Sequence, residues 1–204
     1  ILKEISKLAI KYNLWVLSDE IYSELIYNTT FTSISTLPNM KCRTIVINGF
    51  SKSYAMTGWR IGYLAAPEEL INRAHKIHQY SAMCASTISQ NAAITALKTG
   101  KPYINKMKTT YNKHRQLCLN TFKKIGFKLP KTNGAFYCFP DISITHLNDE
   151  EFAIQLLQEE KVAVIPGSAF GNTAKQFIRC CYATHISDLS EALTRIQRFT
   201  KKRI

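Results

Sequence analysis

Three short apolar runs, each bounded by polar residues and set among helical patterns, place the strongest limit on what this chain can fold into. They are LWVLS at 14–18, TIVING at 44–49 and RIGYLAA at 60–66. Runs of this length predict buried strands. Apolar residues recur at helical spacing over 2–12, and Pro67 followed by two glutamates indicates the start of a second helix. Helices that alternate with buried strands predict an α/β fold built on part of a mostly parallel sheet.

The second half of the chain has a different pattern, which is typical of a smaller α+β unit. Helical spacing over 87–99, closed by Gly100, precedes a long helical pattern over 102–124 that stops at Gly126. Strands are then expected at 134–139, 161–166 and 176–183, with helices at 149–160 and 187–200, the last capped by Ser187 and Asp188. We therefore expect two domains, 1–104 and 105–204, with the helix 102–124 as their connector.

The chain has 204 residues and a formal net charge of +13, and this charge is unevenly distributed. Residues 101–131 contain nine lysines or arginines and no acidic residue. Such a run can bind nucleic acid, but no nucleic-acid-binding motif accompanies it. We therefore favour a solvated helix face, or a surface that meets an acidic segment. No apolar run is long enough to cross a bilayer, so no membrane partner is expected.

Six cysteines are scattered along the chain without a CxxC pair, and most of them lie in apolar sequence. We therefore expect most of them to be buried, reduced thiols, which predicts a cytoplasmic protein. His75 and His78 share a helix face, but no third ligand is near them in sequence. We therefore expect solvated histidines and no metal site.

Polar side chains stand at the ends of the predicted strands. Asp19 directly follows the first apolar run, Lys52 lies just beyond the second in a run of glycine and hydroxyl residues, and Arg60 begins the third. Ligands of α/β sheets gather at the carboxyl ends of strands, so we expect these groups to converge. An amine can form a Schiff base, a carboxylate can hold a protonated pyridine nitrogen, and an arginine can bind a phosphate. Pyridoxal phosphate carries all three partners, and Tyr22 could donate to its ring oxygen.

Each of these residues has a simpler interpretation when it is taken alone. Asp19 could cap a turn, Tyr22 could be a core residue with its hydroxyl at the rim, and Lys52 and Arg60 could be surface charges. Their common position at strand ends favours the cofactor site over four separate coincidences.

Four segments resemble one family, in the order in which that family has them. GFSKSYAMTGWRIG at 49–62 closely resembles the pyridoxal-phosphate attachment segment of class I aminotransferases. SDEIY at 18–22 resembles the segment for the ring nitrogen, and VAVIPGSAFG at 162–171 and FIRCCYA at 177–183 resemble the C-terminal landmarks. The resemblance covers nearly the whole chain and implies the C-terminal half of a fold-type-I enzyme. Residues 1–104 would then be the C-terminal part of the large cofactor domain, and 105–204 the small α+β domain.

Carried over position by position, the resemblance makes Lys52 the Schiff-base lysine and the proton shuttle. Asp19 would pair with the pyridine nitrogen, Tyr22 with the ring oxygen and Arg60 with the phosphate. Arg179 would bind the substrate α-carboxylate through two parallel hydrogen bonds. It could also be a strand-edge charge, but it is a single cation within an apolar strand, where a ligand anion would offset the cost of burial.

The chain also departs from the family. Many relatives carry a hydroxyl three residues before the lysine, where this sequence has Gly49, so we expect Ser51 to contact the phosphate instead. The family's N-terminal half supplies a loop at the phosphate, an aromatic residue that stacks on the ring and an Asn near the ring oxygen, and none has a counterpart here. The chain opens within a helical pattern and without Met, so we expect a fragment of a longer protein.

The expected parent is a homodimeric enzyme that transfers the amino group of an amino acid to a 2-oxo acid, and the isolated chain is expected to be inactive. Two alternatives stay open. One is a carbon–sulfur lyase on the same fold, which would use the same lysine but eliminate at Cβ. The other is a non-catalytic remnant or a basic binding module. Aromatic, dicarboxylic and acylated diamino acids all remain candidate amino donors.

Overall fold

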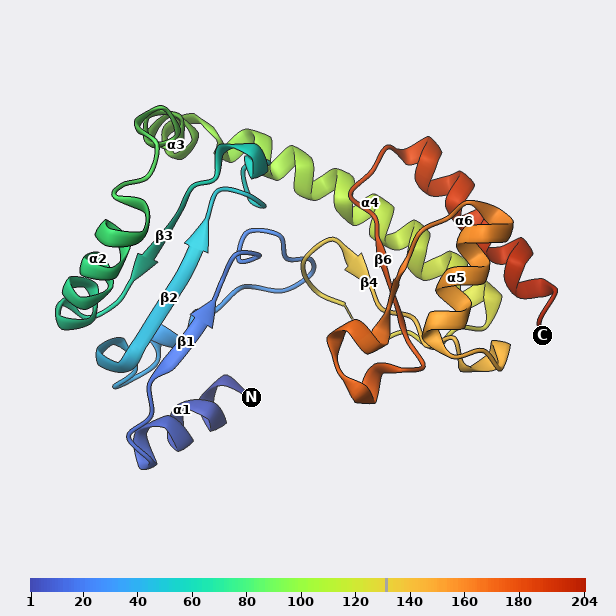
Figure 1. The fold of residues 1–204 in the computed structure, drawn as a ribbon, viewed down its shortest axis with the longest axis horizontal. Helices are drawn as coiled ribbons and strands as arrows, with labels where there is room; N and C mark the ends of the chain where they lie inside the picture. Colours follow the sequence, from blue (N-terminus) through green and yellow to red (C-terminus); the bar gives the residue numbers. More distant parts are fainter. Residues whose placement is uncertain (131) are drawn as a thin grey trace. The chain divides into compact units, whose positions relative to one another are not determined.

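The computed structural model describes residues 1–130 and 132–204, so Lys131, the last cation of the basic run, lies outside the described residues. The chain forms two compact units, Ile1–Lys106 and Met107–Ile204. The ribbon in Figure 1 shows mixed helices and strands in both units, in agreement with the expected α/β and α+β classes. The assignment of the first unit to a cofactor-binding domain and of the second to a small domain stays a prediction.

The first unit is built on a three-stranded sheet in the order β1–β2–β3, with β1 at Val16–Asp19, β2 at Thr44–Gly49 and β3 at Gly62–Ala65. β1 and β2 are parallel, whereas β2 and β3 are antiparallel. The expectation of a mostly parallel sheet is therefore wrong for β3. Because the chain reverses between β2 and β3, the start of β3 lies beside the end of β2, with Gly62 opposite Gly49.

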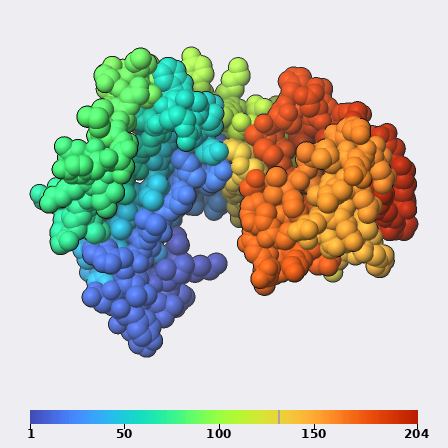
Figure 2. All heavy atoms as spheres, viewed as in Figure 1, coloured from blue at the N-terminus to red at the C-terminus, as the bar shows by residue number. Residues whose placement is uncertain are grey.

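Three helices accompany this sheet: α1 (Leu2–Lys11), α2 (Glu68–Ala82) and α3 (Thr87–Thr99). Ala9 of α1 packs against the buried side chains of Ile34 and Met40. Ala93 of α3 packs against Phe50 and Met56, which belong to the segment that follows β2. Figure 2 shows the spheres of α2 and α3, in green, beside those of β2 and β3. The core of the first unit is thus divided into two small clusters.

One face of the sheet, the open face, is only partly covered, because a hollow separates its side chains from α2. By the strand register Leu17, Ile47 and Leu64 share this face, and they are 65%, 37% and 40% exposed. β1 and β3 are the outer strands, so within the described residues each has one edge without a pairing partner. Apolar side chains and open backbone edges of this kind are normally covered in a folded protein.

The second unit holds an antiparallel sheet in the order β4–β6–β5, with two helices packed on it. The strands are β4 (Tyr137–Cys138), β5 (Ile165–Pro166) and β6 (Ile178–Cys181), and the helices are α5 (Asp149–Glu160) and α6 (Ile186–Lys201). Helix α4 (Lys101–Ile125) begins in the first unit and contributes Phe122 and Ile125 to the core of the second. That core is one continuous cluster, which also contains Phe152, Leu156, Ile178, Tyr182, Leu193 and Phe199.

Short 3-10 helices fill the connections: η1 (Ile34–Thr36), η2 (Lys41–Arg43), η3 (Thr57–Trp59), η4 (Ser143–Thr145), η5 (Gly167–Phe170) and η6 (Asn172–Ala174). The predicted helices agree with the structure to within two residues at their ends. The cap of α6 is an exception, because the N-cap residue is His185, whose side chain accepts from the backbone N–H of Ser187.

The cysteines divide evenly between core and surface. Cys118, Cys138 and Cys180 are buried, while Cys42, Cys84 and Cys181 are exposed, and all six are free thiols. The expectation that most are buried is therefore wrong. Within residues 1–130 and 132–204, no helix combines the length and apolar character that a membrane span requires. The same residues contain no group of three His, Cys, Asp or Glu side chains arranged to hold a metal ion.

Candidate functional site

The carboxyl end of β2 is the point on which three of the predicted site residues converge. Asp19 is the last residue of β1, which runs parallel to β2. Lys52 lies three residues beyond Gly49, the last residue of β2. Arg60 lies two residues before Gly62, which pairs with Gly49 because β3 is antiparallel. The reversed strand therefore brings an arginine to the same sheet end as the carboxylate and the amine.

Two glycines, Gly49 and Gly62, allow β2 and β3 to approach each other closely at this end of the sheet. A Cβ on Gly49 would lie 3.0 Å from Cα of Gly62 and 3.1 Å from the carbonyl oxygen of Ile61. A Cβ on Gly62 would lie 2.9 Å from the carbonyl oxygen of Asn48. A serine at position 49 would therefore push β2 and β3 apart. This contact gives a physical reason why position 49 holds a glycine and not the hydroxyl residue expected from the family.

Lys52 lies in a tight turn that is anchored on both sides. The backbone N–H groups of Tyr54 and Met56 both donate to the carbonyl of Phe50, at 3.2 and 3.3 Å. The rings of Phe50 and Tyr54 are 5.1 Å apart, and the buried Phe50 packs on α3. Lys52 and its neighbour Ser51 are half-buried on this turn. The turn is thus held by its own backbone and by the small core beneath it.

The segment after β1 is tied to the same sheet end. The amide of Asn48 donates to the hydroxyl of Ser23 at 3.1 Å, which places the preceding residue, Tyr22, beside the end of β2. The carboxylate of Asp19 is exposed and accepts from the backbone N–H of Ile21 at 3.1 Å. Among the residues that the structure describes, this is the one hydrogen bond of the Asp19 carboxylate, so its second oxygen is available to a ligand.

Arg60 is exposed, and within residues 1–130 and 132–204 its side chain bonds to a backbone carbonyl and to no acidic group. It has a left-handed conformation, φ +51°, at the end of η3. One guanidinium nitrogen donates to the carbonyl of Thr57 at 2.7 Å. The hydroxyl of Ser89 on α3 donates to the carbonyl of Trp59, also at 2.7 Å, which fixes the residue before Arg60. The remaining guanidinium donors can therefore meet an anion.

Two further polar residues that were not predicted, Asn48 and Tyr63, lie at this sheet end, opposite each other in the register. Burial raises the pKa of Tyr63, and the neighbouring Tyr54, Glu20 and Glu24 raise it further. The Tyr63 phenol is therefore protonated at neutral pH. The Asn-Gly pair at the end of an apolar run was the available signal for Asn48.

The chemical groups at this end of the sheet are of the types that pyridoxal phosphate requires. They include a half-buried amine, an exposed carboxylate and an exposed guanidinium within one small region of the first unit. These groups match the aldehyde, ring nitrogen and phosphate of the cofactor.

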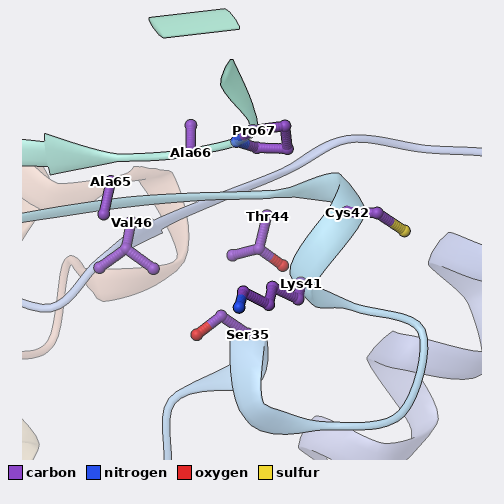
Figure 3. Close-up of a pocket in the computed structure, with 8 residues that line it drawn as sticks. All are labelled: Ser35, Lys41, Cys42, Thr44, Val46, Ala65, Ala66 and Pro67. Carbon is purple, nitrogen blue, oxygen red and sulfur yellow. The ribbon is translucent and has the colours of Figure 1, made fainter. Parts of the chain in front are cut away.

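Two hollows of the first unit lie apart from these residues. A pocket of ≈ 460 Å³ lies at the amino end of β2, the opposite end of the strand, and Figure 3 shows Lys41 and Ser35 across it from Ala65. Its other lining residues are Cys42, Thr44, Val46, Ala66 and Pro67. A second hollow of ≈ 780 Å³ lies between α2 and the strands β2 and β3. Neither is lined by Asp19, Lys52 or Arg60.

Arg179, the predicted carboxylate ligand, lies on the central strand β6 of the second unit. Ile178 and Cys180 on either side of it are buried in the core, whereas Arg179 is half-buried on the other face of the sheet. Its guanidinium carbon lies 4.5 Å from the ring centre of Tyr137 and 4.7 Å from that of Phe170. Arg179 is thus not a strand-edge charge, since β6 is the central strand.

Known proteins match the chain closely in sequence and in structure. The family model "Aminotransferase class I and II" matches residues 1–196. A candidate aminotransferase of Bacillus subtilis, YugH, is 50% identical over 98% of this chain and 52% of its own length. The aspartate aminotransferase of Pyrococcus abyssi is 40% identical over 99% of this chain and 53% of its own length.

Solved structures give the same result. The aromatic aminotransferase of Pyrococcus horikoshii superposes with a TM-score of 0.96 at 41% identity, over 99% of this chain and 55% of that one. The chain spans about half the length of the curated relatives it matches. Over that half the chain has the same fold as the solved aminotransferase structure. The chain therefore belongs to the class I and II aminotransferase family.

Proposed function

We propose that the complete protein is a pyridoxal-phosphate-dependent aminotransferase that moves an amino group from an amino acid to a 2-oxo acid. The observation that carries this proposal is the convergence of Asp19, Lys52 and Arg60 at the carboxyl end of β2. Family membership supports the same reaction.

Each residue has a distinct role in the proposal. Pyridoxal phosphate, when bound, withdraws electrons from the carbon that carries the amino group. The amine of Lys52 attaches the cofactor and moves the proton of that carbon. Asp19 keeps a proton on the ring nitrogen, and Tyr22 donates to the ring oxygen. Arg60 and Ser51 bind the phosphate, while Arg179 binds the substrate carboxylate through its planar pair of donors.

We further propose that the complete protein is a cytoplasmic homodimer. The six free thiols support a reducing compartment. The homodimer is what membership of the class I and II aminotransferase family implies.

Covalent labelling tests the central role of Lys52. Borohydride reduction of the complete holoenzyme, followed by peptide mapping, is expected to give a pyridoxyl group on Lys52. A label on another lysine, with Lys52 free, would show that the assignment is wrong.

Product analysis separates the proposed reaction from elimination. The complete holoenzyme, without borohydride treatment, should transfer amino groups from amino acids to 2-oxo acids. Aspartate and aromatic amino acids should be among the donors tested, because relatives are named for them. Release of pyruvate from cysteine conjugates, without transfer, would instead favour the carbon–sulfur lyase.

A further inference from the structure

Arg179 is held by aromatic rings and not by an acid. Its guanidinium carbon lies 4.5 Å from the ring centre of Tyr137 and 4.7 Å from that of Phe170. Within residues 1–130 and 132–204, its side chain forms neither a hydrogen bond nor an ion pair. A half-buried arginine with five N–H donors and no acceptor is unusual, because burial without a partner is costly.

The two rings reach Arg179 from different parts of the chain. Tyr137 of β4 pairs with Cys181 of β6, which lies on the same face of the sheet as Arg179. Phe170 is delivered by η5, which follows β5. Behind Phe170 lies an aromatic row, in which Phe139 is 5.7 Å from Phe170 and Phe177 is 5.2 Å from Phe139.

The loop that carries Phe170 is fixed by hydrogen bonds and by a close backbone contact that leaves no room for a larger residue. The N–H of Gly167 donates to the carbonyl of Phe177 at 2.8 Å. A Cβ on Gly167 would lie 1.9 Å from the carbonyl oxygen of Ala174, so only glycine fits there. The next residue, Ser168, donates its backbone N–H to the buried carboxylate of Asp149 at 2.6 Å. Such a loop gives Phe170 a defined position.

We propose that Tyr137 and Phe170 are positioning residues for Arg179, and that they stabilise its charge while leaving its N–H donors available to the substrate carboxylate. An aromatic face attracts a cation without accepting strong hydrogen bonds from it. An aspartate or glutamate in the same place would neutralise the arginine and compete with the substrate. This inference rests on the proposed role of Arg179 as the carboxylate ligand.

Binding of simple carboxylates to the complete holoenzyme tests the inference. Glutarate and 3-phenylpropionate are suitable probes, titrated by calorimetry, while the visible absorption of the cofactor is recorded. Phe170→Leu is expected to raise the Kd of both probes about tenfold, because a desolvated cation–π contact is lost. Phe170→Tyr keeps a ring and is expected to restore binding. The absorption of the cofactor should be the same in all variants.

Phe177→Leu is the matched control, because it removes the same group from the same aromatic row without touching Arg179. It is expected to leave both Kd values unchanged. If Phe170→Leu does not give a folded holoenzyme, Tyr137→Leu makes the same test from the other ring.

The outcomes separate this inference from the proposed function. Normal carboxylate binding by Phe170→Leu and Tyr137→Leu, together with loss of binding in Arg179→Lys, would overturn the positioning role and leave Arg179 as the ligand. Normal binding by Arg179→Lys would remove the proposed role of Arg179, and the inference with it. If Phe177→Leu weakens carboxylate binding as much as Phe170→Leu does, the aromatic row affects binding only by stabilising the fold. That result would also overturn the inference.

Discussion

Gly49 controls how closely the strand that leads to Lys52 approaches its neighbour. A Cβ at this position would meet Cα of Gly62 at 3.0 Å and the carbonyl oxygen of Ile61 at 3.1 Å. Both are backbone atoms, so neither can move aside without shifting β3 and, with it, Arg60. The spacing of the proposed cofactor site thus depends on a residue that has no side chain.

Gly49→Ser is therefore expected to destabilise the protein and not to add a phosphate ligand. Overpacking of a tight contact costs about 1–3 kcal/mol in the free energy of unfolding. Urea denaturation of the complete protein measures this cost. Gly58→Ser is the control, because a Cβ on Gly58 has no atom within 4 Å. Tighter phosphate binding by Gly49→Ser, at unchanged stability, would contradict the steric argument.

Adjacent acids at the end of β1 have different environments. Asp19 is exposed and accepts from the backbone N–H of Ile21. Glu20 is buried and accepts from the hydroxyls of Ser18 and Ser33, at 3.2 and 2.5 Å. Asp19 is therefore suited to a ligand and Glu20 to the fold.

Asp19→Asn is expected to lower kcat by about 100-fold or more, with a small change in KM, because its charge acts most strongly as the reaction proceeds. Glu20→Gln is expected to cost about 1–2 kcal/mol of stability, with kcat largely retained. Steady-state kinetics and urea denaturation of both variants check the pair. A change in KM alone for Asp19→Asn would count against its role at the ring nitrogen.

At the scale of elements, the first turn of α5 fixes the loop of η5. Burial by itself would raise the pKa of Asp149, but hydrogen bonds from Ser168 and from the start of α5 outweigh it and hold the pKa below its ordinary value. The ionised form therefore stabilises the folded state. This contribution is complete above the ordinary pKa of an aspartate, about 3.9. It is lost as the pH falls from there through the lower pKa of the folded state.

Asp149→Asn is accordingly expected to lower stability by about 1–2 kcal/mol at pH 7, because a charged acceptor of a short hydrogen bond is lost. The difference from the wild type should shrink as the pH is lowered from 5 towards 2. Urea denaturation across this range measures it. Glu150→Gln is the control, since its exposed carboxylate accepts only from the Ser168 hydroxyl at 3.3 Å. A difference that is independent of pH would show that the ionised carboxylate is not what stabilises the loop.

The elements also show what the sequence could and could not predict. Helical spacing and glycine stops predicted the helices well, because these signals are local. Three strand starts, at 60, 134 and 161, were predicted too early, since Arg60, Ala135 and Lys161 have left-handed backbones, with φ of +51°, +60° and +57°. Nothing in those residue types signals this conformation, which glycine usually adopts. The antiparallel pairing of β3 was missed because strand direction depends on a partner strand.

The candidate site divides in the same way. The position of Asp19, Lys52 and Arg60 at one sheet end was predictable, because each stands beside a strand end within a continuous motif. The aromatic contacts of Arg179 were not, since Tyr137 lies on another strand and the motif that contains Phe170 does not indicate which residue its ring contacts. Motifs therefore identify the groups that meet ligands, while the structure adds the residues that hold those groups.

At the scale of the whole molecule, the first unit has apolar surface that its own helices cover only in part. Leu17, Ile47 and Leu64 share the open face of its sheet, and Leu17 is 65% exposed. Both outer strands present an unpaired edge within the described residues. Relatives that are about twice as long match this chain over only half of their length. The open face is thus suited to further protein surface of the complete enzyme.

Residues 1–204 by themselves are accordingly expected to self-associate and to catalyse amino transfer poorly. Asp19, Lys52 and Arg60 would face open water, which weakens each charge contact with a cofactor. Added pyridoxal phosphate should bind weakly, and turnover should be at least about 100-fold below that of the complete holoenzyme, because the reactants are not held in place. Size-exclusion chromatography and an assay with a panel of amino and oxo acids measure both effects. Leu17→Lys, on the open face, should reduce self-association without restoring turnover. A monodisperse sample of residues 1–204 with full turnover would show that the open face needs no cover for catalysis.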